Sequence, residues 1–177
     1  MRRDQFLGSL VGLAAAPLTA CAAPTDPVRP DPEALTYDPD TLDRLRSAEE
    51  WRTLLTPTEF AVLFQQATEP PDSSPLTSEK RPGTYLCAAC FIPLFDSGTK
   101  YDSRTGWPSF WQPLEGRLGL KPDYALGEQR TEYHCRRCGG HQGHVFDDGP
   151  PPTGKRYCNN GLALRFVPVG QDPPGWR

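Results

Sequence analysis

Cys87-Ala88-Ala89-Cys90 and Cys135-Arg136-Arg137-Cys138 are the stretches that decide the fold of this chain. Each Cys-x-x-Cys places two sulfur atoms on one tight turn, and two such turns supply four thiolates at tetrahedral spacing. Four thiolates leave no open coordination position for a substrate. We therefore expect one structural zinc ion per chain, which fastens the two turns together through Cys87, Cys90, Cys135 and Cys138.

Short strand patterns surround these turns between residues 83 and 168. The clearest is GLALRFVP at 161–168, where Leu162, Leu164 and Phe166 alternate onto one face. Further candidates are 83–87, 131–135 and 156–158. The chain of 177 residues contains 21 prolines and 16 glycines, which favours short elements and many turns.

Residues 41–68, before the strands, have a helical pattern, with apolar residues at helical spacing from Leu42 onward. A second helix is predicted to begin after Thr56, which is a good N-cap. Pro57 suits the first helical position, and Glu59 completes a capping box. An apolar stripe then predicts a packed face: Phe60, Leu63, Phe64 and Ala67. Patterning alone thus indicates a mainly β domain with helices first.

Residues 1–20 have a basic start and a short apolar run, which is typical of an export signal and too short to span a bilayer. The end, Leu18-Thr19-Ala20-Cys21, resembles a bacterial lipoprotein signal with lipid attached to Cys21. An ordinary cleaved signal is the alternative. Residues 21–40 are rich in proline and are expected to form a tether. We expect a membrane-anchored protein that faces the periplasm or the cell exterior.

The remaining chain is expected to form one domain at 41–169 and a loose tail at 170–177. The net charge of −3 and the pI of about 5.6 argue against a nucleic-acid partner, which would normally select a basic face. We expect a monomer.

Disulfides are the alternative to zinc for the four paired cysteines, because an exported protein meets an oxidising compartment. Disulfides within a Cys-x-x-Cys turn are usually redox-active rather than structural. Two of them in one domain would be unusual, so the pattern favours the metal.

Cys158 in the sequence RYCNNG is the thiol that remains when Cys21 is assigned to lipid and the paired cysteines to metal. On a strand, Arg156, Cys158 and Asn160 would share one face. A guanidinium favours the reactive thiolate, and an asparagine amide offers donors to a substrate oxygen. The alternative is that Cys158 is a buried core residue.

His141 and His144 lie three residues apart in HQGH, shortly before Asp148. Histidine is the natural acid near neutral pH, so this pair is a candidate proton donor. The GWPSF turn fixes Trp107 and Phe110, and an aromatic wall suits a small polarizable group such as methylthio. A purely structural histidine pair and a core aromatic turn are the alternatives for the two motifs.

Three further segments, together with the cysteine pairs, carry a family resemblance: KYDSRTGWPSF, HQGHVFDDGPPPTGKRYCNNG and LALRF. With these motifs the chain resembles the B-type methionine sulfoxide reductases, which act on the R epimer, over residues 45 to 168. The resemblance implies two small antiparallel sheets that form a partly open β-barrel, held by one zinc site and preceded by helices.

The resemblance also implies a role for each candidate residue. Cys158 is similar to the nucleophile that attacks the sulfoxide sulfur, which yields methionine and a sulfenic acid. Trp107 resembles the wall that holds the substrate methyl group, Phe110 contributes to the pocket, and Arg156 keeps Cys158 activated. The residues that orient water and substrate and help to protonate the oxygen are His141, His144, Asp148 and Asn160.

One position departs from the family pattern. Many members have a recycling cysteine immediately before GWPSF, where this chain has Thr105. We therefore expect an external thiol, from a thioredoxin-like protein or a small molecule, to reduce the sulfenic acid. The expected substrates are oxidised proteins that contain methionine-R-sulfoxide. A non-catalytic zinc-stapled binding module and a thiol peroxidase are the alternative functions.

Overall fold

The computed structural model describes residues 46–125, 127 and 129–177. The expected export signal (1–20), lipidated Cys21 and tether (21–40) lie outside the described residues. Within the described part, every helix is too short or too polar to cross a membrane.

Two short helices open the described chain, α1 at Ala48–Leu54 and α2 at Pro57–Gln65. The capping box predicted for α2 is confirmed, since the Glu59 carboxylate accepts from the Thr56 N–H at 2.9 Å. The first helix begins at Ala48, where Ser47 caps it in a second capping box, and the part of the helical prediction at 41–45 lies outside the described residues. The second ends at Gln65 rather than at residue 68, because Gln66 adopts a left-handed conformation.

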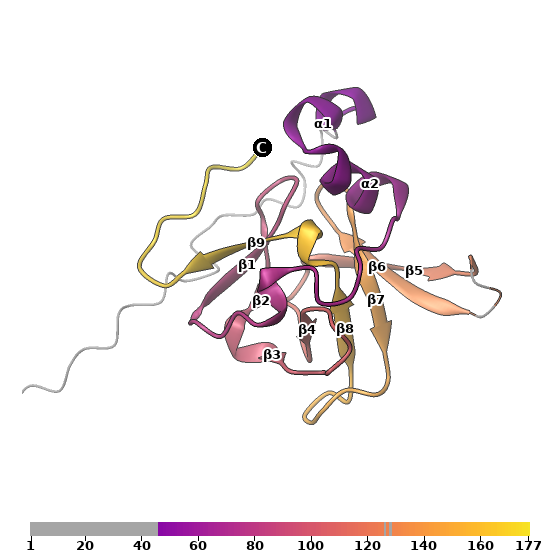
Figure 1. The fold of residues 1–177 in the computed structure, drawn as a ribbon, viewed down its shortest axis with the longest axis vertical. Coiled ribbons are helices and arrows are strands. Elements are labelled where there is room, and N and C mark those ends of the chain that lie inside the picture. Colours follow the sequence, from indigo (N-terminus) through magenta and orange to yellow (C-terminus); the bar gives the residue numbers. More distant parts are fainter. Residues whose placement is uncertain (1–45, 126, 128) are drawn as a thin grey trace, which may run out of the picture.

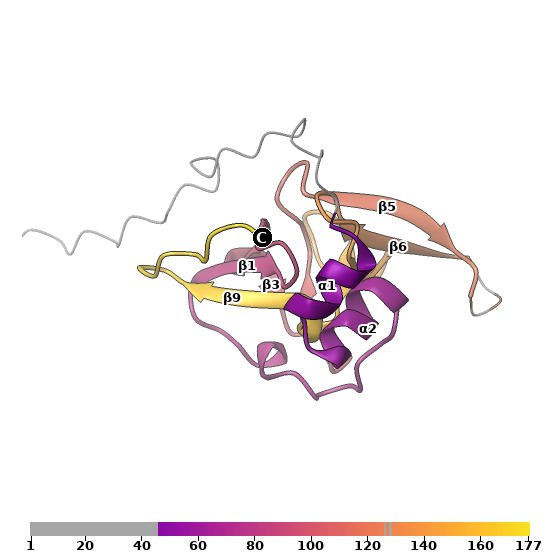
Figure 2. The same cartoon turned by 90° about the horizontal axis from the view of Figure 1, so that it is seen from above.

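Helix α2 covers one end of the sheets, as Figures 1 and 2 show, and packs against β7 and the turn η4 (Gly161–Ala163). Its apolar stripe is confirmed, with Phe60 and Leu63 buried. Glu59 forms an ion pair with Arg165, which joins the helix start to the last strand.

The smaller sheet has the antiparallel order β2-β1-β9, with β2 at Pro93–Asp96, β1 at Gly83–Cys87 and β9 at Leu164–Pro168. The prediction for β1 is confirmed residue by residue. The prediction of a strand over 161–168 is wrong at its start, because residues 161–163 form the 3-10 turn η4. The Glu69 carboxylate accepts the N–H groups of Gly161 and Leu162 and so removes them from any strand ladder.

The larger sheet is antiparallel with the order β3-β4-β8-β7-β6-β5. Its strands are Lys100–Tyr101, Ser109–Phe110, Arg156–Asn159, His141–Phe146, Arg130–Cys135 and Leu118–Asp123. Two further 3-10 turns, Pro75–Thr77 and Ser97–Thr99, lie in the connections. The β5–β6 hairpin projects from the body, and the sheets stay open rather than closing into a barrel (Figure 1). The expected fold class, mainly β with two small antiparallel sheets in a partly open arrangement, is confirmed.

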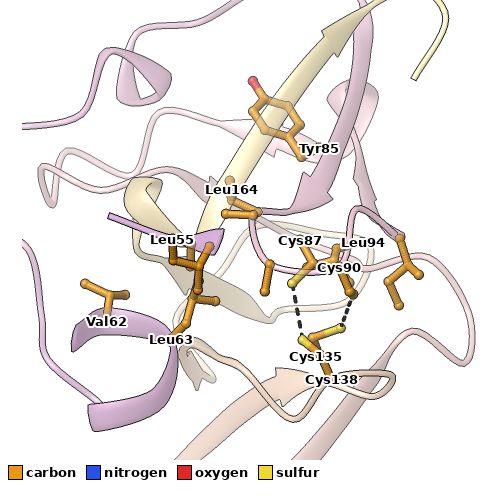
Figure 3. Packing of buried hydrophobic residues seen from close by; sticks show 14 of the residues in the cluster. Leu55, Val62, Leu63, Tyr85, Cys87, Cys90, Leu94, Cys135, Cys138 and Leu164 are labelled. Carbon is orange, nitrogen blue, oxygen red and sulfur yellow. Dashed lines mark hydrogen bonds between the residues drawn. The ribbon is translucent and has the colours of Figure 1, made fainter. Parts of the chain in front are cut away.

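Aromatic rings fill the space between the two sheets. Phe95 stacks on Phe110 with ring centroids 4.2 Å apart, and Tyr85 meets Phe110 edge-on at 4.9 Å. Tyr133 and Tyr157 continue this layer. The aliphatic part of the core, with Leu63 and Leu164, borders the four paired cysteines (Figure 3).

The C-terminal tail, expected to be loose, contacts the body at its end. The Arg177 N–H donates to the Cys90 carbonyl oxygen at 3.3 Å, and its guanidinium donates to the Leu54 carbonyl oxygen at 3.0 Å. Arg137 lies over the Trp176 ring at 4.8 Å. The stacking of Arg137 on Trp176 and the two hydrogen bonds of Arg177 therefore hold residues 176–177 next to the first cysteine turn.

Candidate active site and metal centre

The four paired cysteines converge in the structure, and all are buried free thiols (Figure 3). Their sulfur atoms lie within 4.8 Å of one another, with Cys87 and Cys138 at 3.6 Å and Cys90 and Cys135 at 3.5 Å. Sulfurs at the corners of a tetrahedron about 2.3 Å from a metal would be about 3.8 Å apart. This four-cysteine cluster therefore fits a four-coordinate structural metal.

The two cysteine turns share one backbone geometry. The Phe91 N–H donates to the Cys87 carbonyl oxygen, and the Gly139 N–H donates to the Cys135 carbonyl oxygen, each at 2.9 Å. Phe91 and Gly139 both adopt positive φ, at 64° and 73°. Glycine meets this need in the second turn without strain, whereas the first turn imposes it on a phenylalanine.

A row of side chains crosses the larger sheet. Paired positions in neighbouring antiparallel strands point to the same face. The register pairs His144 with Cys158, Cys158 with Ser109, and Ser109 with Tyr101. On the other side, His144 pairs with Glu132. The register thus places a thiol between a histidine and a hydroxyl on one face of the sheet.

Close contact between β7 and β8 depends on Gly143. A Cβ atom at this position would lie 1.9 Å from the carbonyl oxygen of Cys158. Only glycine allows the two backbones to approach this closely, so Gly143 keeps His144 in register with Cys158.

Cys158 is half-buried, and burial raises the pKa of its thiol above the ordinary value. The Arg156 guanidinium and the hydroxyls of Thr105 and Ser109 oppose this effect without overcoming it. Arg156 acts in the expected direction, since it lowers the pKa of Cys158, but desolvation is the larger influence on this thiol.

A cavity of about 150 Å³ opens beside Cys158, and its surface is mostly apolar. This volume suits a small group such as a methylsulfinyl unit. Nine residues line it: Thr68, Trp107, Arg130, Gly143, His144, Phe146, Cys158, Asn159 and Asn160.

Trp107 is held at the cavity by the loop that follows α2. Its indole Nε1 donates to the Glu69 carbonyl oxygen at 3.1 Å. Gly106 turns the chain at φ +89°, and its carbonyl oxygen accepts from the Asp72 N–H at 2.7 Å. The GWPSF turn is therefore rigid because residues 69–72 fasten it from outside.

Phe110 was expected to contribute to the pocket, and this expectation is wrong. Ser109 pairs with Cys158 and faces the cavity side, so its neighbour on β4 points to the opposite face. There Phe110 is fully buried against Phe95 and Tyr85.

Asn160 lines the cavity, but its amide already has partners. Its side-chain oxygen accepts from the Glu69 N–H at 3.1 Å, and its amide nitrogen donates to the Gln142 carbonyl oxygen at 3.1 Å. Asn160 therefore fixes the walls of the cavity.

Two other predicted site residues, His141 and Asp148, do not line the cavity. His141 is buried, does not line the cavity, and has its Nδ1 at 3.1 Å from the Glu132 carboxylate. Burial lowers the pKa of His141, an effect that Glu132 opposes. Asp148 binds Arg156 through two hydrogen bonds of 2.8 Å, which lower the pKa of this carboxyl group. Asp148 thus orients Arg156, which lies over the cavity residue Phe146 at 4.3 Å.

Two residues of this region were missed from the sequence. The Glu69 carboxylate holds the turn after Cys158, and the Asp123 carboxylate lies 2.7 Å from His144 Nε2. Glu69 follows a helix and Asp123 follows a proline in a weak strand pattern. Neither has a local sequence signal, because each reaches the site through long-range packing.

Comparison with known proteins agrees with this site. The model of the SelR domain matches residues 55–168. The chain is 49% identical over 124 residues to the peptide methionine sulfoxide reductase MsrB of Pseudomonas putida, a match that covers 70% of this chain and 93% of that protein.

Two further relatives carry the same name. The MsrB of Methanosarcina barkeri is 51% identical over 122 residues, covering 68% of this chain and 86% of that protein. The MsrB of Bradyrhizobium diazoefficiens is 46% identical over 140 residues, covering 78% and 99%. The chain therefore belongs to the SelR domain family of B-type methionine sulfoxide reductases and is an oxidoreductase that reduces peptide methionine sulfoxide.

Proposed function

We propose that the chain reduces the R epimer of methionine sulfoxide in proteins through Cys158 and thereby repairs oxidative damage. The observation that carries the proposal is the position of this thiol. Cys158 opens to a small apolar cavity between Trp107 and His144. This cavity supplies a methyl-sized space, a nucleophile and a proton donor within one site.

The proposed reaction transfers the oxygen atom from substrate to enzyme. The Cys158 sulfur attacks the sulfoxide sulfur and forms an S–S bond, while the oxygen accepts a proton because it is otherwise a poor leaving group. The hydroxyl then moves to the Cys158 sulfur as the S–S bond and the substrate S–O bond break. The products are methionine and a sulfenic acid at Cys158, so the substrate sulfur is reduced and the cysteine sulfur is oxidised. His144 acts as the proton donor in this scheme, and Trp107 holds the methyl group.

Recycling requires a thiol from outside the described domain. Among the described residues, every cysteine other than Cys158 belongs to the four-cysteine cluster. An external thiol therefore attacks the sulfenic acid, releases water and forms a mixed disulfide. A second thiol then breaks this disulfide and restores Cys158. A thioredoxin-like exported protein or a small thiol serves this role.

We propose zinc as the metal of the four-cysteine cluster. Soft thiolate ligands in tetrahedral geometry select Zn²⁺ among common divalent ions. The cluster would hold one ion per chain and play no direct part in the reaction, since it lies in the core. It joins the start of the smaller sheet to the end of β6.

Export and lipid attachment at Cys21 remain part of the proposal on sequence grounds. The combination of an apolar leader, a small-residue cleavage region and Cys21 supports a membrane-anchored protein outside the inner membrane. The mass of the N-terminal peptide from the membrane fraction tests this, since cleavage before Cys21 and an acyl mass are both expected. An unmodified Cys21 would contradict it.

Turnover of separated sulfoxide epimers tests the activity. The domain should reduce the R epimer of a peptide methionine sulfoxide with dithiothreitol as reductant and leave the S epimer unchanged. Cys158→Ser should be inactive. Loss of peroxide without turnover of the R epimer would favour a thiol peroxidase, and absence of both activities would favour a binding module.

A further inference from the structure

Asp123 is the immediate partner of the histidine that lies opposite Cys158. Its Oδ2 lies 2.7 Å from His144 Nε2. Both side chains are largely buried, at 11% and 14% exposure. A carboxylate only accepts hydrogen bonds, so the proton of a neutral His144 ring belongs on Nε2. The nitrogen left for the thiol and the substrate is Nδ1.

The Asp123 carboxylate is itself fixed by two other donors. The Ala125 N–H donates to Oδ1 at 2.9 Å, and Arg130 donates to Oδ2 at 2.6 Å. These contacts and the one with His144 hold the pKa of Asp123 well below its usual range. The group therefore carries a full negative charge at any pH where the enzyme works.

Other charged groups near His144 are already paired. Glu132, which is opposite His144 on β6, lies 3.1 Å from His141 Nδ1 and 3.2 Å from the Lys121 ammonium. The His141 ring lies against His144 with centroids 5.4 Å apart. Among the acidic groups described here, Asp123 is the one in hydrogen-bond contact with the His144 ring.

We propose that Asp123 is a positioning residue that holds the Nε2–H tautomer of His144 and stabilises the ring when it becomes cationic. This inference rests on the proposed function. The Cys158 thiol must lose its proton as its sulfur attacks. His144 Nδ1 accepts this proton and passes it to the sulfoxide oxygen, and the ring is cationic in between. A fixed negative charge at Nε2 favours that cation, as in other acid–base relays oriented by a third group.

The same carboxylate couples the β5–β6 hairpin to the reaction. Asp123 ends β5 and Arg130 begins β6, so their ion pair lies at the loop end of the hairpin, next to the connection between the two strands. Arg130 also lines the cavity. The hairpin that projects in Figures 1 and 2 thus contributes two side chains to one site, both from the end of the hairpin next to its turn.

The first part of the test measures the His144 ring directly, without substrate. Nitrogen-15 NMR of the wild-type domain, at a pH where the ring is neutral, should show the proton on Nε2. A proton on Nδ1 would overturn the proposal. This reading is independent of turnover, so it separates the inference from the proposed function, which fails if the wild type does not reduce the R epimer.

The second part compares first-turnover rates of methionine formation. Asp123→Asn keeps the shape and removes the charge, and it should lower the rate about 10- to 100-fold, a share of what acid–base catalysis contributes. The KM should change less than twofold, because Asp123 does not line the cavity. Asp123→Glu should restore part of the rate. Wild-type rates in Asp123→Asn would overturn the proposal.

Asp147→Asn is the matched control. It makes the same chemical change on an exposed carboxylate that pairs with Lys155 at the protein surface. Its rate should stay within about twofold of the wild type, as is usual for surface positions. An equal loss of rate in Asp147→Asn and Asp123→Asn would assign the effect to net charge and contradict a specific role for Asp123.

Discussion

The hydroxyl of Thr105 lies near the thiol of Cys158 and lowers its pKa. The side chain at position 105 therefore already reaches the reactive sulfur, although it is a threonine that cannot form a disulfide. Ser103 supports it with a hydrogen bond of 2.8 Å. A sulfur atom at position 105 would therefore be close to the reactive sulfur.

Thr105→Cys should convert the domain to internal recycling. After one equivalent of the R sulfoxide and no reductant, mass spectrometry should find a disulfide between position 105 and Cys158. The wild type should instead accumulate a sulfenic acid that dimedone traps. Thr53→Cys on α1 adds a thiol in another part of the molecule and should behave as the wild type. Two free thiols in oxidised Thr105→Cys would contradict the contact.

Glu69 links the loop after α2 to both sides of the cavity. Its carboxylate accepts two buried backbone N–H groups, at 2.6 Å from Gly161 and 2.8 Å from Leu162. Its own backbone bonds to Trp107 and Asn160. Glu69→Ala leaves both donors without an acceptor, and each costs about 1–3 kcal/mol.

The free energy of unfolding of Glu69→Ala should therefore fall by about 2–4 kcal/mol in a urea titration. The KM for the sulfoxide should rise, because the loop whose backbone holds Trp107 and Asn160 loses its side-chain anchor at Gly161 and Leu162. Glu115→Ala, at an exposed position, should change stability by less than about 0.5 kcal/mol. A Glu69→Ala protein with unchanged stability and KM would show that this link is dispensable.

The parts of the fold with local causes could be predicted from the sequence. The Thr56–Glu59 capping box, the paired cysteine turns and the alternating strand at 83–87 each depend on neighbouring residues. The strand expected from 161 failed at its start because of Glu69, which lies far away in the sequence. A local sequence pattern cannot predict a hydrogen-bond acceptor, such as the Glu69 carboxylate, that tertiary packing brings to the strand.

The same distinction separates the site residues. Cys158 and Trp107 could be predicted to share a site, and both line the cavity. Cys158 is the cysteine that belongs to no Cys-x-x-Cys pair, and Trp107 lies in a Gly-Trp-Pro turn, and both features are visible in the sequence. Phe110 was misplaced, since the side to which it points depends on the pairing of β4 with β8. Asp123 was missed because the sheet places β5 and β7 on either side of β6 and so brings Asp123 to His144 across one strand.

The reactivity of Cys158 should depend strongly on pH. Burial raises the pKa of its thiol, so the thiolate becomes abundant only above the ordinary cysteine value of about 8.5. Alkylation by iodoacetamide should thus be slow at neutral pH and accelerate as the pH rises. Arg156→Met removes a group that lowers this pKa, so it should raise the pKa further and slow alkylation at neutral pH relative to the wild type.

Lys155→Met is the control for Arg156→Met, because it removes a neighbouring cation that pairs with Asp147 on the surface. Its alkylation rate should match the wild type. Equal rates for the wild type and Arg156→Met across the pH range would mean that Arg156 orients the substrate and does not influence the thiol.

Removal of the metal should affect both the core and the reactive cysteine. Cys135→Ser breaks the four-cysteine cluster, so the purified protein should lose its zinc, measured by elemental analysis. Unfolding free energy should drop by more than about 4 kcal/mol, as is typical when a structural metal is lost. Cys158→Ser should keep one zinc per chain and most of the stability.

Gln142 gives the reason to expect an effect on the reaction as well. The side-chain Nε2 of Gln142 lies 3.5 Å from Cys87 Sγ. Its backbone carbonyl oxygen accepts from the Asn160 backbone N–H at 2.8 Å. Partial chelation under conditions where the domain stays folded should therefore slow the first turnover of Cys158. Gln142→Leu should weaken this dependence, since the side-chain contact to the cluster is gone. If chelated, folded protein kept the full rate, the cluster would act on stability alone.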